Sequence, residues 1–254
     1  MSNLYTSLAE VYEAMYQSFI NYDEEYNFYN GILLKYQCKS VLEIGCGTGN
    51  LASRFAKHQF EYVGLDMSDD MLGIAKKNNP GVHFIKGDMR SLDLREQVAS
   101  CIITGRTVSY LVTDKDIYDT FSAINKNLNA AGIICFDFID AGKFIPFIDP
   151  DKKIIHKANF KNKKYHRDSY WSVNKTQSGA FNWTSVYFEE NATGGLMKIG
   201  EDNSTVRAFN KDEMINFLQH TGFQIKEIIE RPSYAFDTFV IVAEKGNYTL
   251  QGIN

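Results

Sequence analysis

Three short segments of the 254-residue sequence hold residue types that bind nucleoside ligands. An apolar run at 41–44 ends in Gly45-Cys46-Gly47-Thr48-Gly49, whose alternating glycines let backbone approach a ligand closely. Asp66 ends the next apolar run, where a carboxylate can accept hydrogen bonds from both hydroxyls of a ribose. Asp88 ends the third run, where a carboxylate could meet an adenine amine. Together these positions favour a site for an adenosine-containing ligand.

The residues next to the glycines separate two kinds of ligand. A nicotinamide dehydrogenase would share Asp66, but its GxGxxG fingerprint needs a third glycine where this chain has Asn50. It also has an apolar residue at the position of Glu43. A carboxylate so close to the loop suits a ligand with a cationic end, and S-adenosylmethionine carries a sulfonium and an ammonium but no phosphate. For the glycines alone, a tight strand–helix turn without a ligand stays the alternative.

The elements around these residues alternate between strand and helix patterns. Such an order predicts crossover units and a parallel sheet. From about 150 to 208 the residues instead alternate in polarity with dense turn chemistry, which predicts antiparallel hairpins. A helix that begins at Asn210 or Asp212 and two further strands follow. The strands are expected at 41–44, 62–65, 82–85, 101–104, 133–138, 223–229 and 238–243.

We therefore predict one α/β unit with an insertion, in four parts. These are a helical lid at 1–39, a cofactor-binding core at 40–145, an antiparallel β insertion at 146–208, and a C-terminal helix with the last two strands at 209–246. A hydrophobic content of 44% and a net charge of -4 fit such a globular unit.

Bulk properties exclude several other classes. A pI near 5.8 argues against a protein built to grip nucleic acid phosphates. Residues 1–25 hold no Lys or Arg, and no apolar run approaches the length of a membrane span. The four Cys residues are scattered, so reduced thiols in the cytoplasm and no membrane partner are expected.

The three segments resemble the signature segments of class I S-adenosylmethionine-dependent methyltransferases. They read V-L-E-I-G-C-G-T-G at 41–49, L-D-M-S at 65–68 and G-D-M at 87–89, and the resemblance covers about 1–145 and the elements after 208. It implies a Rossmann-like, mostly parallel seven-stranded sheet with an antiparallel last strand and helices on both faces. It also implies S-adenosyl-L-methionine as cofactor and S-adenosyl-L-homocysteine as product.

The resemblance further implies where the cofactor touches the chain. Asp66 would bind the ribose, and Glu43 would act near the methionine end through the loop or a water molecule. Arg106 either holds the carboxylate of the cofactor or pairs on the surface. The other implied contacts come from the glycine loop and from the ends of the second and third strands: Gly45, Cys46, Gly47, Gly49, Met67, Asp88 and Met89.

Tyrosine is concentrated at the start of the chain, with seven of the 15 Tyr residues before residue 40. Tyr5, Tyr12 and Tyr16 fall on one helical stripe, which either packs the core or faces a ligand. A buried Tyr needs a partner for its hydroxyl, and aromatic faces can accept the spreading positive charge of methyl transfer. We therefore predict Tyr12 as a catalytic candidate, and Tyr5 and Tyr16 as cofactor contacts.

The spacing Tyr5-x-x-Leu8-Ala9-x-x-Tyr12-x-x-Met15-Tyr16 is similar to that of a smaller group of small-molecule N-methyltransferases. That group includes the N,N-dimethyltransferases of nucleotide-linked amino sugars, and it tends to have an antiparallel insertion after the fifth strand. Amino-sugar enzymes carry a His shortly after the fourth strand, where this chain has Tyr110. Tyr110 is thus the second catalytic candidate, at the sheet edge where ligands bind.

The expected activity is methyl transfer by in-line displacement to a small-molecule acceptor, at nitrogen rather than oxygen. An oxygen nucleophile needs a stronger base or a metal. The five His residues show no metal-ligand spacing, so no metal is expected. An RNA or protein methyltransferase and a non-catalytic cofactor-binding domain are the alternatives, and the protein is expected to be a monomer or a homodimer.

Seven basic residues and no acid lie between Lys152 and Arg167. They either receive an anionic substrate or nucleic acid, or they form a solvated strand whose Lys residues protect a sheet edge. The second interpretation is favoured.

Overall fold

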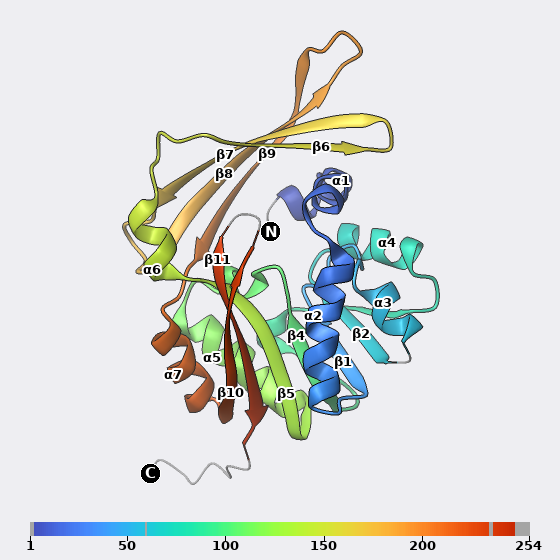
Figure 1. Ribbon diagram of the computed structural model, residues 1–254, viewed down its shortest axis with the longest axis vertical. Coiled ribbons are helices and arrows are strands. Elements are labelled where there is room, and N and C mark those ends of the chain that lie inside the picture. The colour runs from blue at the N-terminus through green and yellow to red at the C-terminus, as the bar shows by residue number, and fades with distance from the viewer. Residues whose placement is uncertain (1–2, 59, 234–235, 247–254) are drawn as a thin grey trace.

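Two β-sheets organise the computed structural model, which describes residues 3–58, 60–233 and 236–246. A seven-stranded sheet has the order β10-β11-β5-β4-β1-β2-β3, and a four-stranded sheet has the order β6-β7-β8-β9. The smaller sheet lies above the upper edge of the larger one, with helix α1 between them (Figure 1). Residues 1 and 2 of the predicted lid lie outside the described residues.

The larger sheet has the predicted strand directions. β1, β2, β3, β4 and β5 run parallel to one another. β11 is antiparallel to β5, and β10 is antiparallel to β11. This confirms a mostly parallel sheet with an antiparallel last strand. The strands are β1 (Ser40–Ile44), β2 (Glu61–Asp66), β3 (His83–Lys86), β4 (Val98–Ile103), β5 (Leu128–Ile139), β10 (Phe223–Pro232) and β11 (Asp237–Lys245).

Helices cover both faces of this sheet because its strands bury side chains on both faces. In β1, Leu42 and Ile44 join the apolar cluster that contains residues of α5 and α7. Val41, which points to the opposite face, joins the cluster that contains residues of α2, α3 and α4. These helices are α2 (Tyr22–Lys35), α3 (Ala52–Lys57), α4 (Asp69–Asn78), α5 (Asp114–Asn127) and α7 (Lys211–His220).

Capping side chains set several helix starts. Ser68 accepts from the Met71 N–H at the start of α4. Asn210, one of the two expected starts, caps α7. At α5, Thr113 is the cap and Asp114 is the first helical residue, and the Thr113 hydroxyl accepts from the Asp116 N–H at 3.1 Å.

The N-terminal segment forms two helices rather than one. After the 3₁₀ helix η1 (Asn3–Tyr5), α1 (Ala9–Phe19) ends at Ile20, and Asn21 caps α2. The Asn21 side chain accepts from the N–H groups of Asp23 and Glu24 at 3.2 and 3.3 Å. The break lets α1 lie under the smaller sheet while α2 packs on the larger one (Figure 1).

The insertion is the predicted antiparallel sheet. Its strands β6 (Ile154–Phe160), β7 (Lys163–Val173), β8 (Ala180–Glu190) and β9 (Leu196–Arg207) pair consecutively and antiparallel. The chain reaches it through the short helices α6 (Ala141–Phe144) and η4 (Ile145–Phe147). Trp171 packs against Phe144 and Phe236, and Trp183 packs against Phe236, so both side chains help to attach the insertion to the core.

The basic stretch divides between exposed and buried positions. Lys153 pairs with Asp168, Lys163 with Glu189 and Lys164 with Glu190, all on the exposed part of the insertion. Arg167 is instead fully buried, with its guanidinium 5.5 Å from the ring centroid of Phe19 on α1. These contacts support the interpretation of a solvated strand rather than a basic receiving surface.

Arg207, at the end of β9, ties the insertion to the core. Its side chain is 4% exposed and donates to the carboxylates of Asp114 and Glu213 and to the Val112 carbonyl. Arg207→Met should therefore lower the free energy of unfolding by about 2 kcal/mol, because the partly exposed carboxylates lose their partner. Urea denaturation measures this, with the exposed Lys198→Met as control, and equal stability of both variants would contradict the anchoring role.

Candidate active site

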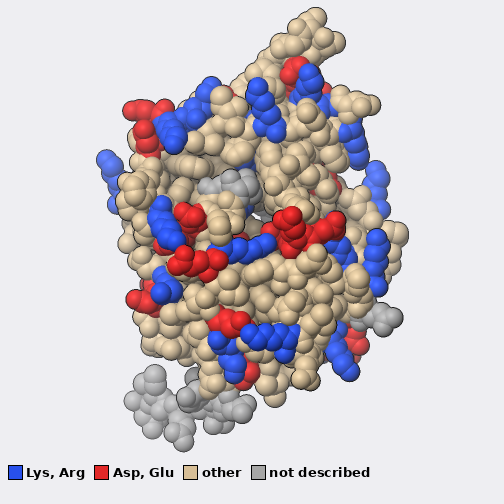
Figure 2. All heavy atoms as spheres, in the orientation of Figure 1, with Lys and Arg blue, Asp and Glu red and all other residues tan. Residues whose placement is uncertain are grey.

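A cavity of about 680 Å³ opens at the carboxyl edge of the larger sheet, below the insertion. Its size is within the ~300–1,000 Å³ range of small-molecule sites, and this edge is where open α/β sheets bind ligands. On the face drawn in Figure 2 the surface is hollowed between insertion and core, and acidic and basic side chains gather along the lower border. Twelve predicted site residues line the cavity: Tyr5, Tyr12, Tyr16, Glu43, Gly45, Cys46, Gly47, Asp66, Met67, Met89, Arg106 and Tyr110.

Gly49 and Asp88 do not line this cavity. The Asp88 carboxylate caps the 3₁₀ helix η2 (Met89–Ser91) and pairs with Arg90 at 2.6 Å. That ion pair lowers the pKa of Asp88 and directs its side chain to a local partner. A Cβ on Gly49 would lie 2.7 Å from the Asn79 side chain, so this glycine allows close packing of the loop on α4.

The glycine loop is held by backbone bonds and by Asp66. Gly45 and Gly47 have φ values of 70° and 54°, which favour glycine. The N–H groups of Gly45 and Cys46 both donate to the Leu65 carbonyl, at 2.8 and 3.0 Å. Asp66 accepts from the Gly47 N–H at 2.9 Å and from the Ser68 N–H at 2.9 Å. The carboxylate that would bind a ribose is thus fixed from two sides.

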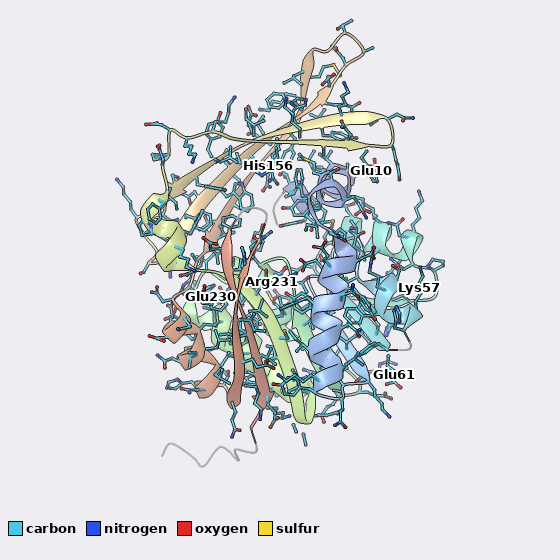
Figure 3. All side chains as sticks on the ribbon, in the orientation of Figure 1. Glu10, Lys57, Glu61, His156, Glu230 and Arg231 are labelled. Atoms are coloured by element: carbon cyan, nitrogen blue, oxygen red, sulfur yellow. The ribbon has the colours of Figure 1, made fainter. Side chains whose placement is uncertain are left out.

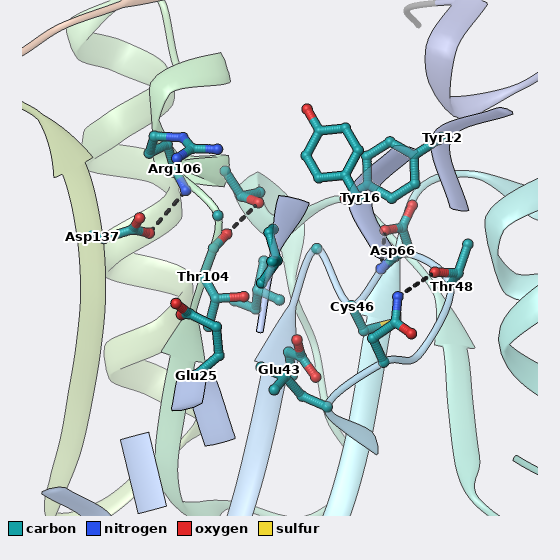
Figure 4. A pocket seen from close by; sticks show the side chains of 18 of the residues that line it. Tyr12, Tyr16, Glu25, Glu43, Cys46, Thr48, Asp66, Thr104, Arg106 and Asp137 are labelled. Carbon is teal, nitrogen blue, oxygen red and sulfur yellow. Dashed lines mark hydrogen bonds between the residues drawn. The ribbon is translucent and has the colours of Figure 1, made fainter. Parts of the chain in front are cut away.

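Glu43 forms part of the cavity floor, below Asp66 and beside Cys46 (Figure 4). It is only 3% exposed and accepts from the Tyr62 hydroxyl at 2.5 Å. Burial raises the pKa of Glu43 to about 8, and the negative charge of Asp66 adds to this. The Tyr62 hydrogen bond counteracts the rise only in part.

Four tyrosines form one wall of the cavity. The rings of Tyr12 and Tyr16 stack with centroids 4.1 Å apart, and Tyr5 meets the edge of Tyr12 at 5.5 Å. The Tyr5 hydroxyl lies 2.6 Å from the Tyr110 hydroxyl, across 105 positions of sequence. Burial raises the pKa of Tyr5 well above its usual value, so this hydroxyl stays protonated at neutral pH. The helical stripe therefore faces a cavity, and Tyr110, at the end of the 3₁₀ helix η3 (Thr107–Tyr110) that follows β4, joins it.

Charged residues occupy the opposite side of the cavity. The buried Arg106 donates its backbone N–H to Asp137 at 2.8 Å, and its guanidinium donates to Ser233 at 3.0 Å. Arg231, at the upper end of β10 (Figure 3), makes two hydrogen bonds to Glu25, at 2.8 and 2.9 Å. Burial raises the pKa of Asp137 despite the neighbouring Arg106. Arg106 thus lines the cavity instead of pairing on the surface.

The sequence did not single out several lining residues. Glu25 and Arg231 are 206 residues apart, so no local pattern pairs them. Asn203, Ser204 and Thr205 of β9 provide a polar wall from the insertion. Strand alternation alone does not say which residues of the insertion face inward.

Among residues 3–58, 60–233 and 236–246, no group of three or more His, Cys, Asp or Glu side chains is placed to hold a metal ion. Within the same ranges, no helix has both the length and the apolar character needed to cross a bilayer.

The chain is similar in sequence to known methyltransferases over part of its length. Residues 41–132 match a family model described as a methyltransferase domain. A putative methyltransferase of Bacillus subtilis (strain 168) is 32% identical over 101 residues, 38% of this chain and 41% of that protein. The dTDP-3-amino-3,4,6-trideoxy-alpha-D-glucopyranose N,N-dimethyltransferase of Streptomyces venezuelae is 29% identical over 98 residues, 39% of this chain and 41% of that protein. The matches thus span less than half the length of these curated relatives.

A solved structure is similar over a longer part of the chain. It is the S-adenosylmethionine-bound CalS10, an amino pentose methyltransferase from Micromonospora echinaspora involved in calicheamicin biosynthesis. The TM-score is 0.78 with 20% identity, over 92% of this chain and 96% of that one, and this likeness concerns the fold. Sheet order, edge cavity and matched segment agree with the predicted resemblance to the class I S-adenosylmethionine-dependent methyltransferases.

The side chains present fit the cofactor of that class. Asp66 lies at the end of β2 and can receive ribose hydroxyls, and Met67 and Met89 line the same cavity and could contact the adenine. The space above Gly47 is open up to the Tyr12 ring, 4.0 Å from where a Cβ would stand. Glu43 supplies a carboxyl group beneath the loop for the cationic end of the ligand.

The raised pKa of Glu43 predicts a pH-dependent stability of the ligand-free protein. In the unfolded chain this carboxyl ionises near its ordinary pKa of 4.5, and in the folded chain only near about 8. The folded state therefore binds more protons within this window, so the free energy of unfolding falls as the pH rises from about 4.5 to 8.

Glu43→Gln should remove that contribution and make stability less dependent on pH over the same window. Chemical denaturation at a series of pH values measures it. The difference between the wild type and the variant is the informative quantity, because Asp66 and Asp137 also have raised pKa values. Parallel pH curves for the two proteins would contradict a carboxyl group held neutral by burial.

Proposed function

We propose that the protein transfers a methyl group from S-adenosylmethionine to an amine nitrogen of a small molecule. The observation that carries the proposal is one cavity that joins the glycine loop and Asp66 to a wall of four tyrosines. The relative from Streptomyces venezuelae is named as an N,N-dimethyltransferase of an amino sugar, which supports nitrogen as the acceptor atom.

The cofactor side would be formed by the loop and the strand ends. Asp66 would bind the ribose, and the Gly45–Gly49 backbone and Glu43 would lie along the methionine end. The bound cofactor would supply an electrophilic methyl group on a positively charged sulfur. The stacked Tyr12 and Tyr16 rings exclude water from this part of the cavity and offer aromatic faces to the positive charge.

The acceptor side would be formed by the Tyr5–Tyr110 pair and by the polar wall of β9. Of the described residues that line the cavity, none is a histidine, so proton removal by an imidazole is not part of the proposal. The two linked hydroxyls can accept a hydrogen bond from an amine N–H and direct its lone pair toward the methyl group. The amine would lose its proton to solvent before binding.

The charge of the cavity bears on the acceptor as well. Arg106 and Arg231 line it beside Asp137 and Glu25, which offset part of their charge. These two guanidinium groups would contact the negatively charged part of a substrate such as a nucleotide-linked amino sugar. A cavity of about 680 Å³ suits a metabolite better than an RNA or a folded protein. We infer a small-molecule substrate, while the basic stretch of the insertion takes no part.

The proposal is tested with S-adenosylmethionine that carries a labelled methyl group. The protein is incubated with a panel of amines that includes nucleotide-linked amino sugars, with hydroxyl analogues of the same compounds as controls. Transfer to an amine and not to its hydroxyl analogue supports the proposal. Cofactor binding without transfer to any acceptor would favour a binding domain without catalysis, and transfer only to RNA or protein would overturn the small-molecule assignment.

Asp66→Ala should weaken S-adenosylhomocysteine binding by on the order of 1–3 kcal/mol, because the ribose hydroxyls lose a charged acceptor. Isothermal titration calorimetry measures the dissociation constant. Asp69→Ala is the matched control, since Asp69 pairs with Lys86 on the surface. An unchanged dissociation constant for Asp66→Ala would contradict the cofactor assignment.

Tyr110→Phe should lower kcat about tenfold, equal to about 1.4 kcal/mol, because it removes a hydroxyl that orients the amine. The dissociation constant for S-adenosylhomocysteine should stay the same. The exposed Tyr118→Phe on α5 is the control. If Tyr110→Phe keeps full kcat, the hydroxyl pair serves packing alone.

A further inference from the structure

A network of four polar side chains joins α1 to the glycine loop. Glu13 of α1 is 8% exposed, and its carboxylate accepts from the Thr48 hydroxyl and from the Asn50 amide, the latter at 3.1 Å. Gln17, one turn further along α1, donates to the other carboxylate oxygen at 3.1 Å. Two residues of the helix are thus bonded to two residues of the loop through one buried carboxylate.

The network closes on itself. The Asn50 amide also donates to the Thr48 hydroxyl at 2.9 Å, and the Gln17 amide donates to the Asn50 carbonyl oxygen. The Thr48 hydroxyl thereby donates to Glu13 and accepts from Asn50. Asn50 stands where a dinucleotide-binding loop has its third glycine, and its side chain holds a helix here. Asn50, which argues against a dinucleotide-binding loop, thus also bonds to α1.

The other attachments of α1 differ in kind. Its apolar side packs under the insertion, where Met15 joins a cluster with Tyr165 and Tyr187. Toward the core, the Ser68 hydroxyl donates to the Tyr5 carbonyl, and the Tyr12 ring lies above Gly47. Among these described contacts, the Glu13 network provides side-chain hydrogen bonds between α1 and the loop that would carry the cofactor.

The loop itself depends on such support. Its glycines have left-handed φ values but no Cβ atoms, so few side-chain contacts restrict the backbone. Asp66 fixes the Gly47 N–H from the β2 side. Thr48 is the buried side chain on the α1 side, and its hydroxyl is bonded to Glu13. Loss of the Glu13 carboxylate would free one side of the loop and one side of the helix together.

We propose that Glu13 is a positioning residue that couples closure of α1 to the binding shape of the glycine loop. Opening of the helix for ligand entry then releases Thr48, and the loop loses its fixed shape at the same time. A ligand held by the ordered loop favours the closed helix by linkage. The proposal rests on the proposed cofactor site, but part of its test needs no ligand.

The first measurement uses the ligand-free protein. Glu13→Gln keeps the size of the side chain and replaces one acceptor oxygen with a donor that faces Thr48 and Asn50. Hydrogen exchange followed by mass spectrometry should show faster exchange in α1 and in residues 45–50 together. Glu10→Gln is the control, because Glu10 lies exposed on the same helix (Figure 3). Faster exchange in α1 with an unchanged loop would overturn the coupling.

The second measurement concerns binding and turnover. In Glu13→Gln, the dissociation constant for S-adenosylhomocysteine should rise about tenfold, with faster dissociation in stopped flow. The KM for S-adenosylmethionine should rise by a similar factor while kcat does not fall, since no reacting atom meets Glu13. A fall in kcat with an unchanged KM would overturn the positioning role.

A second pair of variants keeps the proposal falsifiable if Glu13→Gln folds poorly. Thr48→Val removes the hydroxyl at nearly constant volume and should reproduce both effects, whereas Thr48→Ser keeps the hydroxyl and should restore wild-type behaviour. In the double variant, the effects of Glu13→Gln and Thr48→Val should not add, because both remove the same bond. Full additivity would contradict the network.

The outcomes also separate this proposal from the proposed function. If the wild type binds no S-adenosylhomocysteine, the cofactor assignment fails, and the hydrogen-exchange comparison still decides whether Glu13 couples helix and loop. If the wild type binds and Glu13→Gln binds equally well with unchanged exchange, the function stands and the coupling is wrong.

Discussion

The site depends on the meeting of the first two parallel strands at their carboxyl ends. There the Leu65 carbonyl of β2 accepts from two consecutive N–H groups that follow β1, and the Asp66 side chain accepts from a third, that of Gly47. These bonds turn the chain sharply, so the loop and the carboxylate that we propose binds the ribose have one fixed relative position. The pairing of β1 with β2 and β4 thus sets both the fold and the cofactor side of the cavity.

Local sequence was enough to predict that half of the molecule. Strand ends, glycines and Asp66 are consecutive features of one crossover unit, and the carboxyl ends of parallel strands must share an edge. A second local pattern, alternating polarity with turn residues, predicted the antiparallel insertion.

The other half of the cavity needed the folded chain. Tyr5 and Tyr110 meet across 105 residues, and Glu25 and Arg231 meet across 206, so no spacing rule connects them. The many tyrosines near the N-terminus indicated that their hydroxyls need polar partners. Which hydroxyl bonds to which partner depends on how α1 packs under the insertion, and the sequence does not show this. Asp88 shows a different case: it does not line the cavity, and its carboxylate pairs with the nearby Arg90.

The two halves of the cavity also differ in how freely their residues can change in evolution. The segment that matches the methyltransferase family model, 41–132, contains the glycine loop, Asp66 and Tyr110, but it ends before the insertion. The β9 wall belongs to a separate sheet that meets the core through side chains such as Arg207 rather than through shared strands. A change of residue on that wall leaves the geometry of the loop untouched. Selection can therefore change the residues proposed to meet the acceptor while the segment proposed to bind the methyl donor is inherited unchanged.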